Sequence, residues 1–271
     1  MVDIYSAPIV SGDSNLPIPV TIVENDTELY WRMALDMFRE VSVGSLEDSP
    51  TVFIVPVGPV WQYRRFILLV KELGLDLSKM HLFFMDEYLA DDGSLIDTGH
   101  PLSFRGFVEE ELADLLSAPT SLFSRKQIHF PDPADPGAYD EVIADMGGAD
   151  VCYAGVGING HLAFNEAPCG PDEPSRVLKL TPETITTNSH TALGGAYERI
   201  PKKAVTVGMK SILSSRRLSL WMNRPWQQTV ARKLLFGPVG RDFPASFARK
   251  HQNASLTMTS HVAEVPKFSL R

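Results

Sequence analysis

Short apolar runs alternate with longer amphipathic segments along most of this 271-residue chain. The run over residues 51–57 is continuous and rich in β-branched side chains, which is typical of a strand buried on both faces of a sheet. Such strands need helices over both faces, and helical patterns separate the apolar runs here. The sequence therefore predicts an α/β fold in a single domain, with a mostly parallel sheet and helices on both faces. We expect strands over residues 20–23, 51–57, 80–84, 151–156, 205–207, 218–222 and 255–258, and helices over residues 29–41, 59–73, 102–116, 139–146, 226–235 and 245–251.

The segments between these elements differ in composition. Residues 1–19 are rich in Pro, Ser and Gly, and predict an extended N-terminal arm ahead of a domain over residues 20–271. Polar residues over 86–100 and the prolines within 157–174 predict two loops. A long ordered loop inside a compact domain commonly carries function. We find no repeat and no internal domain boundary.

Charge and hydropathy exclude several classes of partner. The formal net charge is −8 and the basic residues occur singly or in pairs, so the basic stripe of a nucleic-acid partner is missing. No apolar run approaches the roughly 20 residues of a membrane span, and the N-terminus lacks the pattern of a signal peptide. We therefore expect no membrane partner and a cytoplasmic location. Cys152 and Cys169 are the only cysteines, which excludes a disulfide framework but leaves a single bridge open.

Ionisable side chains follow two of the expected strands. Asp86 and Glu87 come after one of them, and His161 and Glu166 lie beyond another. Ligands of open α/β sheets bind in the crevice beyond the carboxyl ends of the strands. Carboxylates and an imidazole in that crevice predict proton transfer on a small molecule. The structural alternative for Asp86 and Glu87 is helix capping or solvation. For the other pair it is a locally satisfied histidine beside a solvated glutamate.

Gly155, Gly157 and Gly160 match the G-x-G-x-x-G fingerprint of dinucleotide-binding sites. That fingerprint opens a helix whose N-terminus holds the pyrophosphate, whereas this segment runs into His161 and a proline-rich loop. We therefore expect no nicotinamide or flavin cofactor, and interpret the glycines as letting the backbone turn and approach a ligand. The other histidines show no metal-ligand spacing, so no metal site is expected.

Three segments follow one another along the chain: MDEY over residues 85–88, HPLSF over 100–104 and GHLAFNE over 160–166. Shorter stretches at residues 175–176, 187–189 and 201–208 continue the order. This set resembles the glucosamine-6-phosphate deaminase family over about residues 20–265. The related 6-phosphogluconolactonases share the Gly-His step but lack the MDEY segment. The resemblance implies a Rossmann-like fold of the deaminase/isomerase type, and an aldose–ketose isomerisation coupled to loss of ammonia without a redox cofactor.

The resemblance also implies roles for individual residues. Asp86 matches the base that moves a proton between C2 and C1 of the sugar. His161 matches the residue that assists ring opening, with Glu166 orienting it. Asn159 stands where many members carry an aspartate, and an amide can orient the imidazole but cannot take a proton. The expected substrate contacts are Glu87, Gly58, Gly157, Gly160, His190, Arg176 and Arg224.

The phosphate end departs from the family pattern. The family's first strand usually leads into a Gly- and Ser/Thr-rich loop, whereas residues 56–60 lack hydroxyl groups and Pro59 lacks a backbone donor. The resemblance aligns the family's phosphate arginine with His190 and its phosphate lysine with a position near Gln227. The cations that could rebuild an anion site are Arg224, Arg64 and Lys210.

Two substrate classes are therefore open. One is an amino-sugar phosphate held by a rearranged phosphate site, and the other is a related sugar without phosphate at that end. Because the proton-transfer residues are retained, deaminase-like or isomerase chemistry on a sugar or sugar phosphate is the principal prediction. The alternatives are a non-catalytic sugar sensor, suggested by Asn159, and a sugar lactonase with His161 as base. A homo-oligomer is possible.

Overall fold

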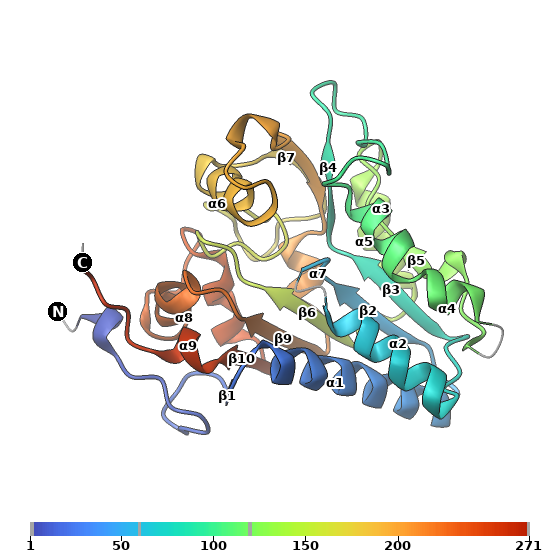
Figure 1. Ribbon diagram of the computed structural model, residues 1–271, viewed down its shortest axis with the longest axis horizontal. Coiled ribbons are helices and arrows are strands. Elements are labelled where there is room, and N and C mark those ends of the chain that lie inside the picture. Colours follow the sequence, from blue (N-terminus) through green and yellow to red (C-terminus); the bar gives the residue numbers. More distant parts are fainter. Residues whose placement is uncertain (1–2, 59–60, 119–120, 270–271) are drawn as a thin grey trace.

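The computed structural model describes residues 3–58, 61–118 and 121–269, which form an α/β domain with one large sheet covered by helices (Figure 1). Seven strands within these residues form this sheet, all parallel, in the order β1-β10-β9-β6-β2-β3-β5. The fold class predicted from the sequence is confirmed. The strands are Val20–Val23 (β1), Thr51–Val55 (β2), Met80–Phe84 (β3), Ile128–His129 (β5), Val151–Gly155 (β6), Arg217–Met222 (β9) and Ala254–Thr259 (β10).

Strand β2 shows why the sheet is covered on both faces. All five of its residues are buried. Val52 and Ile54 belong to one core cluster, whereas Phe53 and Val55 belong to another. Successive side chains of a strand point to opposite faces, so a strand between two cores must be apolar throughout. Each such side chain contributes roughly 1.5–3 kcal/mol on full burial.

Helices complete the two cores. On one face lie α1 (Asp26–Leu46), α2 (Trp61–Leu73), α3 (Phe104–Glu111) and α4 (Ala113–Ser117), and on the other lie α5 (Pro136–Asp145), α7 (Met209–Leu213), α8 (Gln227–Phe236) and α9 (Ser260–Ala263). The helix predicted over residues 102–116 is divided into α3 and α4 at Leu112, and the one predicted over 245–251 is a 3₁₀ helix over Pro244–Lys250. In the described ranges, no helix is long and apolar enough to cross a membrane.

A second sheet, antiparallel and in the order β4-β8-β7, adjoins the carboxyl ends of the first. Its strands are Asp86–Leu89 (β4), Arg176–Lys179 (β7) and Lys203–Thr206 (β8). The chain passes from β3 into β4 through Met85, whose N–H donates to the Val55 carbonyl and whose carbonyl accepts from Val207 N–H. The loop predicted over residues 86–100 is therefore wrong at its start, because pairing with β8 buries all four residues of β4.

Helix α6 (Pro182–Ala192) stands beside this second sheet (Figure 1). Neither α6 nor β7 is predicted by the sequence analysis, because α6 consists mostly of Thr, Ser and other polar residues and shows little apolar periodicity. Its start signal is local: the Thr181 side chain accepts from the backbone N–H of Thr184, and Pro182 takes the first helical position.

The N-terminal segment contains a 3₁₀ helix over Ile4–Ser6 and otherwise has no regular structure over residues 3–19. It lies beside α8 (Figure 1), where Arg232 is fully buried. The Arg232 guanidinium donates to three backbone carbonyls, one each from the N-terminal segment, α8 and α9. These are the carbonyls of Ala7 at 3.1 Å, Gln228 at 2.9 Å and Ala263 at 2.8 Å.

Candidate active site

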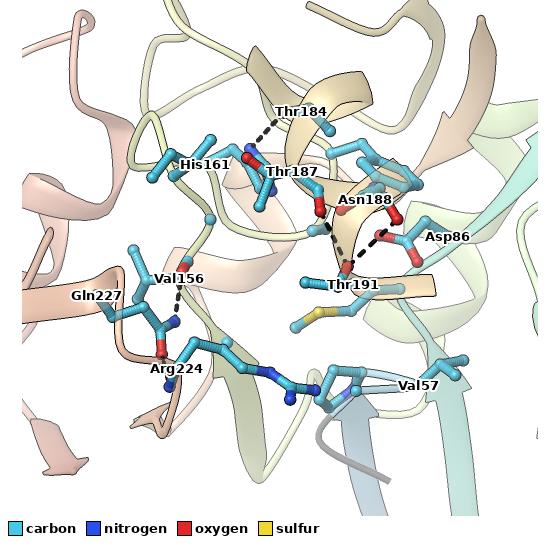
Figure 2. Close-up of a pocket in the computed structure, with 18 of the residues that line it drawn as sticks. Val57, Asp86, Val156, His161, Thr184, Thr187, Asn188, Thr191, Arg224 and Gln227 are labelled. Carbon is cyan, nitrogen blue, oxygen red and sulfur yellow. Dashed lines mark hydrogen bonds between the residues drawn. The ribbon is translucent and has the colours of Figure 1, made fainter. Parts of the chain in front are cut away.

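A pocket of about 230 Å³ opens at the carboxyl ends of β9, β6, β2 and β3. These four strands are neighbours in the sheet, so segments distant in sequence meet there. Figure 2 shows Asp86, His161 and Arg224 around this one space. Sites for drug-sized ligands measure roughly 300–1,000 Å³, so this pocket suits a ligand the size of one monosaccharide. It lies at the sheet edge where the sequence analysis expects a ligand.

Asp86 is the first residue of β4 and lines the pocket. Its side chain is largely buried, at 7% exposure. Burial, together with the neighbouring charge of Glu87, raises the pKa of Asp86 well above its usual range. A carboxylate of this kind at a pocket wall accepts a proton more readily near neutral pH than a solvated one.

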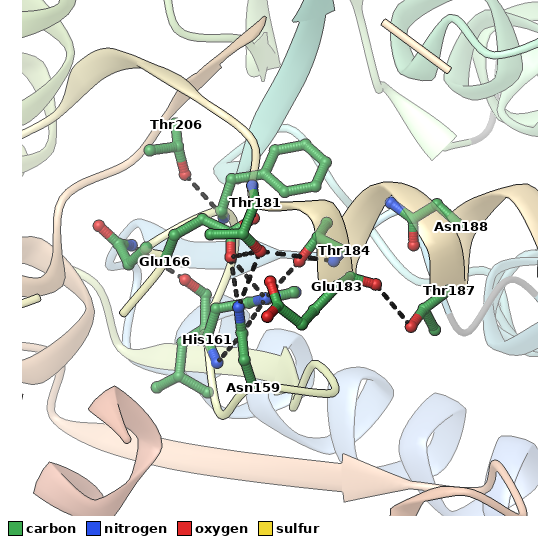
Figure 3. Close-up of polar contacts among 12 residues, drawn as sticks. Asn159, His161, Glu166, Thr181, Glu183, Thr184, Thr187, Asn188 and Thr206 are labelled. Carbon is green, nitrogen blue, oxygen red and sulfur yellow. Dashed lines mark hydrogen bonds and ion pairs between the residues drawn. The ribbon is translucent and has the colours of Figure 1, made fainter. Parts of the chain in front are cut away.

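His161 lines the same pocket from the loop after β6, and hydrogen bonds hold its ring (Figure 3). Its Nδ1 lies 2.8 Å from Asn159 Oδ1 and 3.6 Å from Glu166 Oε2. The Asn159 amide nitrogen donates to Glu166 Oε2 at 2.6 Å, so its carbonyl oxygen faces the imidazole. An oxygen at that position requires a proton on Nδ1, which leaves Nε2 as a hydrogen-bond acceptor.

Glu166 lies behind His161, outside the pocket wall. It also accepts from the Thr181 hydroxyl at 3.0 Å. Burial alone would raise its pKa, but hydrogen bonds and the charge of His161, with further bonds from Asn159 and Thr184, lower the pKa of Glu166 to about 2. Glu166 is therefore anionic at neutral pH, and it positions the imidazole largely through Asn159.

Gly157 makes room for the imidazole. A Cβ at residue 157 would lie 2.0 Å from Nε2 of His161. Gly160 has a φ of +83°, and a Cβ there would lie 2.5 Å from the ring of Phe243. Gly157 lines the pocket, whereas Gly160 is buried beneath Phe243 and does not. The predicted turn is therefore present at Gly160, whereas Gly157 leaves room for the His161 ring. The predicted approach of this backbone to a ligand stays a prediction.

One wall of the pocket comes from α6, a helix that the sequence does not predict. Four of its polar residues line the pocket at spacings of three and four: Thr184, Thr187, Asn188 and Thr191. The Thr187 hydroxyl donates to the Glu183 carbonyl at 2.9 Å, and the Thr191 hydroxyl donates to the Thr187 carbonyl at 3.1 Å. The Asn188 amide donates to the Tyr88 hydroxyl at 2.8 Å. The helical spacing of these residues behind a Thr-Pro cap is the one signal that could have found them.

Glu87 does not reach the pocket wall. It is fully buried and accepts from the backbone N–H groups of Phe104 at 3.0 Å and Arg105 at 2.8 Å. The Ser103 hydroxyl donates to it at 3.0 Å. Its carboxylate therefore binds the N-terminal end of α3, as the helix-capping alternative describes for this residue.

Two further predicted contacts also lie off the pocket wall. Arg176 donates to the Asn165 side chain at 2.8 Å. His190 is exposed in the last turn of α6, about a third of a turn away from the row of residues that faces the pocket. The structure does not bring these two side chains to the site, because neighbouring packing and helix phase direct them elsewhere.

The end of the pocket remote from His161 contains Arg224, whose guanidinium reaches toward Val57 (Figure 2). Gln227 fixes the turn behind it. Its Oε1 accepts from Asn223 N–H at 2.9 Å and from Arg224 N–H at 2.8 Å. Its Nε2 donates to the Val156 carbonyl at 2.8 Å. Gln227 therefore supports the turn that carries Arg224.

Arg64 and Lys210, the two other predicted cations for this end, do not line the pocket. Arg64 is bonded to Glu111 on α3, with Nε 2.8 Å from Oε2. Lys210 is exposed on α7 and does not line the pocket. Within the part of the chain that the structure describes, Arg224 is the one lysine or arginine that lines the pocket.

No family model matches the chain. It is similar to glucosamine-6-phosphate deaminase 2 of Bacillus subtilis (strain 168), with 30% identity over 205 residues that cover 73% of this chain and 78% of that one. The chain belongs to the glucosamine-6-phosphate deaminase family. A glucosamine-6-phosphate deaminase of Shouchella clausii (strain KSM-K16) is 28% identical over 255 residues, covering 90% of this chain and 95% of that one.

Solved structures agree on the fold of the family. A monomeric glucosamine-6-phosphate deaminase matches with a TM-score of 0.80 and 23% identity, covering 91% of this chain and 99% of that one. The 6-phosphogluconolactonase from Trypanosoma cruzi matches with a TM-score of 0.66 and 15% identity, over 90% and 95% of the two chains. Because deaminases and lactonases share this fold, the chemistry must be argued from the site.

Neither cysteine takes part in the site. Cys152 and Cys169 are both buried and free, so the single bridge left open by the sequence is not formed. In the described ranges, no group of His, Cys, Asp and Glu side chains is arranged to hold a metal ion.

Proposed function

We propose that this protein converts an amino sugar from aldose to ketose and releases its amino group as ammonia. Asp86, His161, Asn159 and Glu166 form the catalytic group in this proposal. The observation that carries it is the convergence of Asp86 and His161 on one pocket from two separate segments. The family relatives, which are named as deaminases of glucosamine 6-phosphate, support the same chemistry.

In this proposal His161 opens the sugar ring. Its unprotonated Nε2 accepts the proton of the anomeric hydroxyl and then gives a proton to the ring oxygen. The imidazole is positively charged between these two transfers. The anionic Glu166, bonded to Asn159 and 3.6 Å from Nδ1, stabilises that charge. Asn159 links Glu166 to the imidazole and fixes the orientation of the ring, but it takes no proton.

In this proposal Asp86 catalyses the isomerisation. Its carboxylate removes the proton from C2 of the open-chain sugar and returns a proton to C1. The resulting imine at C2 reacts with water to give a ketone and ammonia. The raised pKa of Asp86 suits this role, because a base accepts a proton from carbon more readily when its pKa is closer to that of the substrate.

The test is to measure ammonia and ketose together from glucosamine, galactosamine and their 6-phosphates, using wild-type protein and the Asp86→Asn variant. We expect equal amounts of the two products from at least one sugar with the wild-type protein. The variant should release neither above background. Ammonia release that is the same in the two proteins would contradict the proposal.

A lactonase is the second candidate, favoured by the fold shared with 6-phosphogluconolactonases. It needs only His161 as base, so it predicts hydrolysis of a sugar lactone that is retained in the Asp86→Asn variant. A non-catalytic sugar sensor predicts binding without release of any product. The same protein pair therefore distinguishes all three functions.

A further inference from the structure

The α6 wall of the pocket offers hydrogen-bond acceptors. The hydroxyl hydrogens of Thr187 and Thr191 are used on carbonyls of their own helix, and an amide hydrogen of Asn188 is used on Tyr88. A hydroxyl that donates to its own helix has its lone pairs left to accept. This wall suits the ammonium and hydroxyl groups of an amino sugar. An ionised phosphate ester has only acceptor oxygens and would find few partners along it.

Among the residues that the structure describes, the remote end of the pocket offers one permanent cation. Arg224 lines it, whereas Gln227 is held by the backbone and the Asn223 amide donates to the Tyr30 hydroxyl at 3.0 Å. Val57 and Trp221 add apolar surface. The group recognised at this end must therefore be matched chiefly by a single guanidinium.

The charge of the substrate group distinguishes a phosphate from a carboxylate at the Arg224 end. A phosphate monoester carries about −1.5 to −2 charges at neutral pH, so one guanidinium neutralises little more than half of it. A carboxylate carries one negative charge, and its two oxygens match the planar fork of a guanidinium. The anionic Glu166 lies behind the other end of the pocket and makes a second uncompensated charge less favourable.

Resting on the deaminase function proposed above, we infer that the substrate is an amino sugar with a carboxylate, not a phosphate, at the end remote from its amine. This is the chemistry of a 2-amino-2-deoxyhexuronic acid. Its amine and hydroxyl groups face Asp86 and the α6 wall, and its carboxylate pairs with Arg224. Arg224 is then the residue that determines specificity at this end.

The experiment compares ammonia release from 2-amino-2-deoxyglucuronic acid, glucosamine and glucosamine 6-phosphate. We expect kcat/KM for the uronic acid to exceed each of the other two by at least tenfold. Glucosamine 6-phosphate as the preferred substrate would overturn the inference. Equal kcat/KM values for the uronic acid and glucosamine would overturn it as well.

The Arg224→Gln variant locates the effect. It should lower kcat/KM for the uronic acid by about 30-fold or more, mainly through KM, and lower that for glucosamine by less than threefold. Arg64→Gln is the matched control, because that arginine is bonded to Glu111 outside the pocket, and it should leave the ratio of the two substrates unchanged. An equal loss for both sugars in Arg224→Gln would indicate a merely structural role and contradict the inference.

Failure of the proposed deaminase function would give a different result from failure of the carboxylate inference. If none of the three sugars yields ammonia above the Asp86→Asn level, the deaminase function is wrong. Calorimetric binding of the same three sugars then decides the inference by itself. The uronic acid must bind most tightly, and Arg224→Gln must remove that preference. Any other ranking overturns it.

Discussion

The His161 end and the Arg224 end of the pocket hold their polar side chains in different ways. At the first, Asn159, Glu166 and Thr181 form a closed set of hydrogen bonds behind the imidazole (Figure 3). At the second, Arg224 extends from an exposed turn into the pocket, and its side chain is not part of such a set (Figure 2). Proton transfer depends on geometry held within fractions of an ångström, and a rigid end serves it. Under the proposals above, the first end carries out the reaction and Arg224 at the second end selects the substrate.

Asp86→Asn tests whether the reaction depends on the first end. We expect kcat to fall by about 10³-fold, because an amide cannot take the C2 proton. Because burial raises the pKa of Asp86, the acid limb of the wild-type kcat profile should lie above the usual carboxylate range. Ammonia release across pH measures both. Activity that persists in the variant would remove Asp86 from the mechanism.

Gly157→Ala tests the rigidity of the imidazole. The added Cβ would meet Nε2 of His161 at 2.0 Å, so the ring must move. A shift of that size costs roughly 10²-fold in kcat/KM. Gly240→Ala is the matched control, because a Cβ there meets nothing within 4 Å and Gly240 lies outside the pocket. Equal kinetics for the two variants would show that the ring is not held as described.

Glu166→Gln tests the charge behind the imidazole. The folded-state pKa of Glu166 is lowered from 4.5 to about 2, so its ionised form stabilises the fold above pH 4.5 and that contribution disappears as the pH falls toward 2. The variant should lose roughly 3 kcal/mol of unfolding free energy at neutral pH. Denaturant titrations at a series of pH values should show the gap to wild type narrowing in acid. A gap independent of pH would mean that packing, not charge, is lost.

Asn159→Asp tests the amide link. It places a carboxylate beside Glu166, where the amide donor now lies 2.6 Å from Oε2. Two carboxylates so close favour the protonated imidazole or share a proton. The acid limb of the kcat/KM profile should therefore move to higher pH by about one unit. An unchanged pH profile of kcat/KM would show that the charge at residue 159 does not affect the reaction.

His190→Ala should have the smallest effect. The side chain is exposed and outside the pocket wall, so kcat/KM should stay within about twofold of wild type, as for most exposed surface positions. Thr187 lies about one turn earlier and lines the pocket. Thr187→Val removes its hydroxyl from the pocket and should therefore raise KM. A larger effect from His190 would mean that α6 turns a different face to the substrate.

The sequence predicts the side chains that follow the strands better than the side chains that α6 brings to the pocket. Asp86 and His161 follow apolar strands directly, and parallel strands bring their carboxyl ends to one edge. Glu87 is different, because only the folded chain shows that the N-terminal end of α3 meets its carboxylate. The face of α6 is equally hidden, because its polar composition gives no apolar phase from which to place His190. Strands β3, β6 and β9 lie within one residue of their predicted bounds, because burial of nearly every residue leaves an almost continuous apolar run.

The buried Arg232 joins the N-terminal segment, α8 and α9 on the side of the molecule that carries the Arg224 turn. Its Nε is satisfied by the Ala7 carbonyl, and the same guanidinium ties α9 to α8. Gln227, the first residue of α8, sets the turn that carries Arg224. A truncated version beginning after Ala7 would leave a buried donor without its acceptor, at a cost of roughly 1–3 kcal/mol. A shift in sugar preference on removal of residues 1–7 would therefore be expected to come from the Arg224 turn.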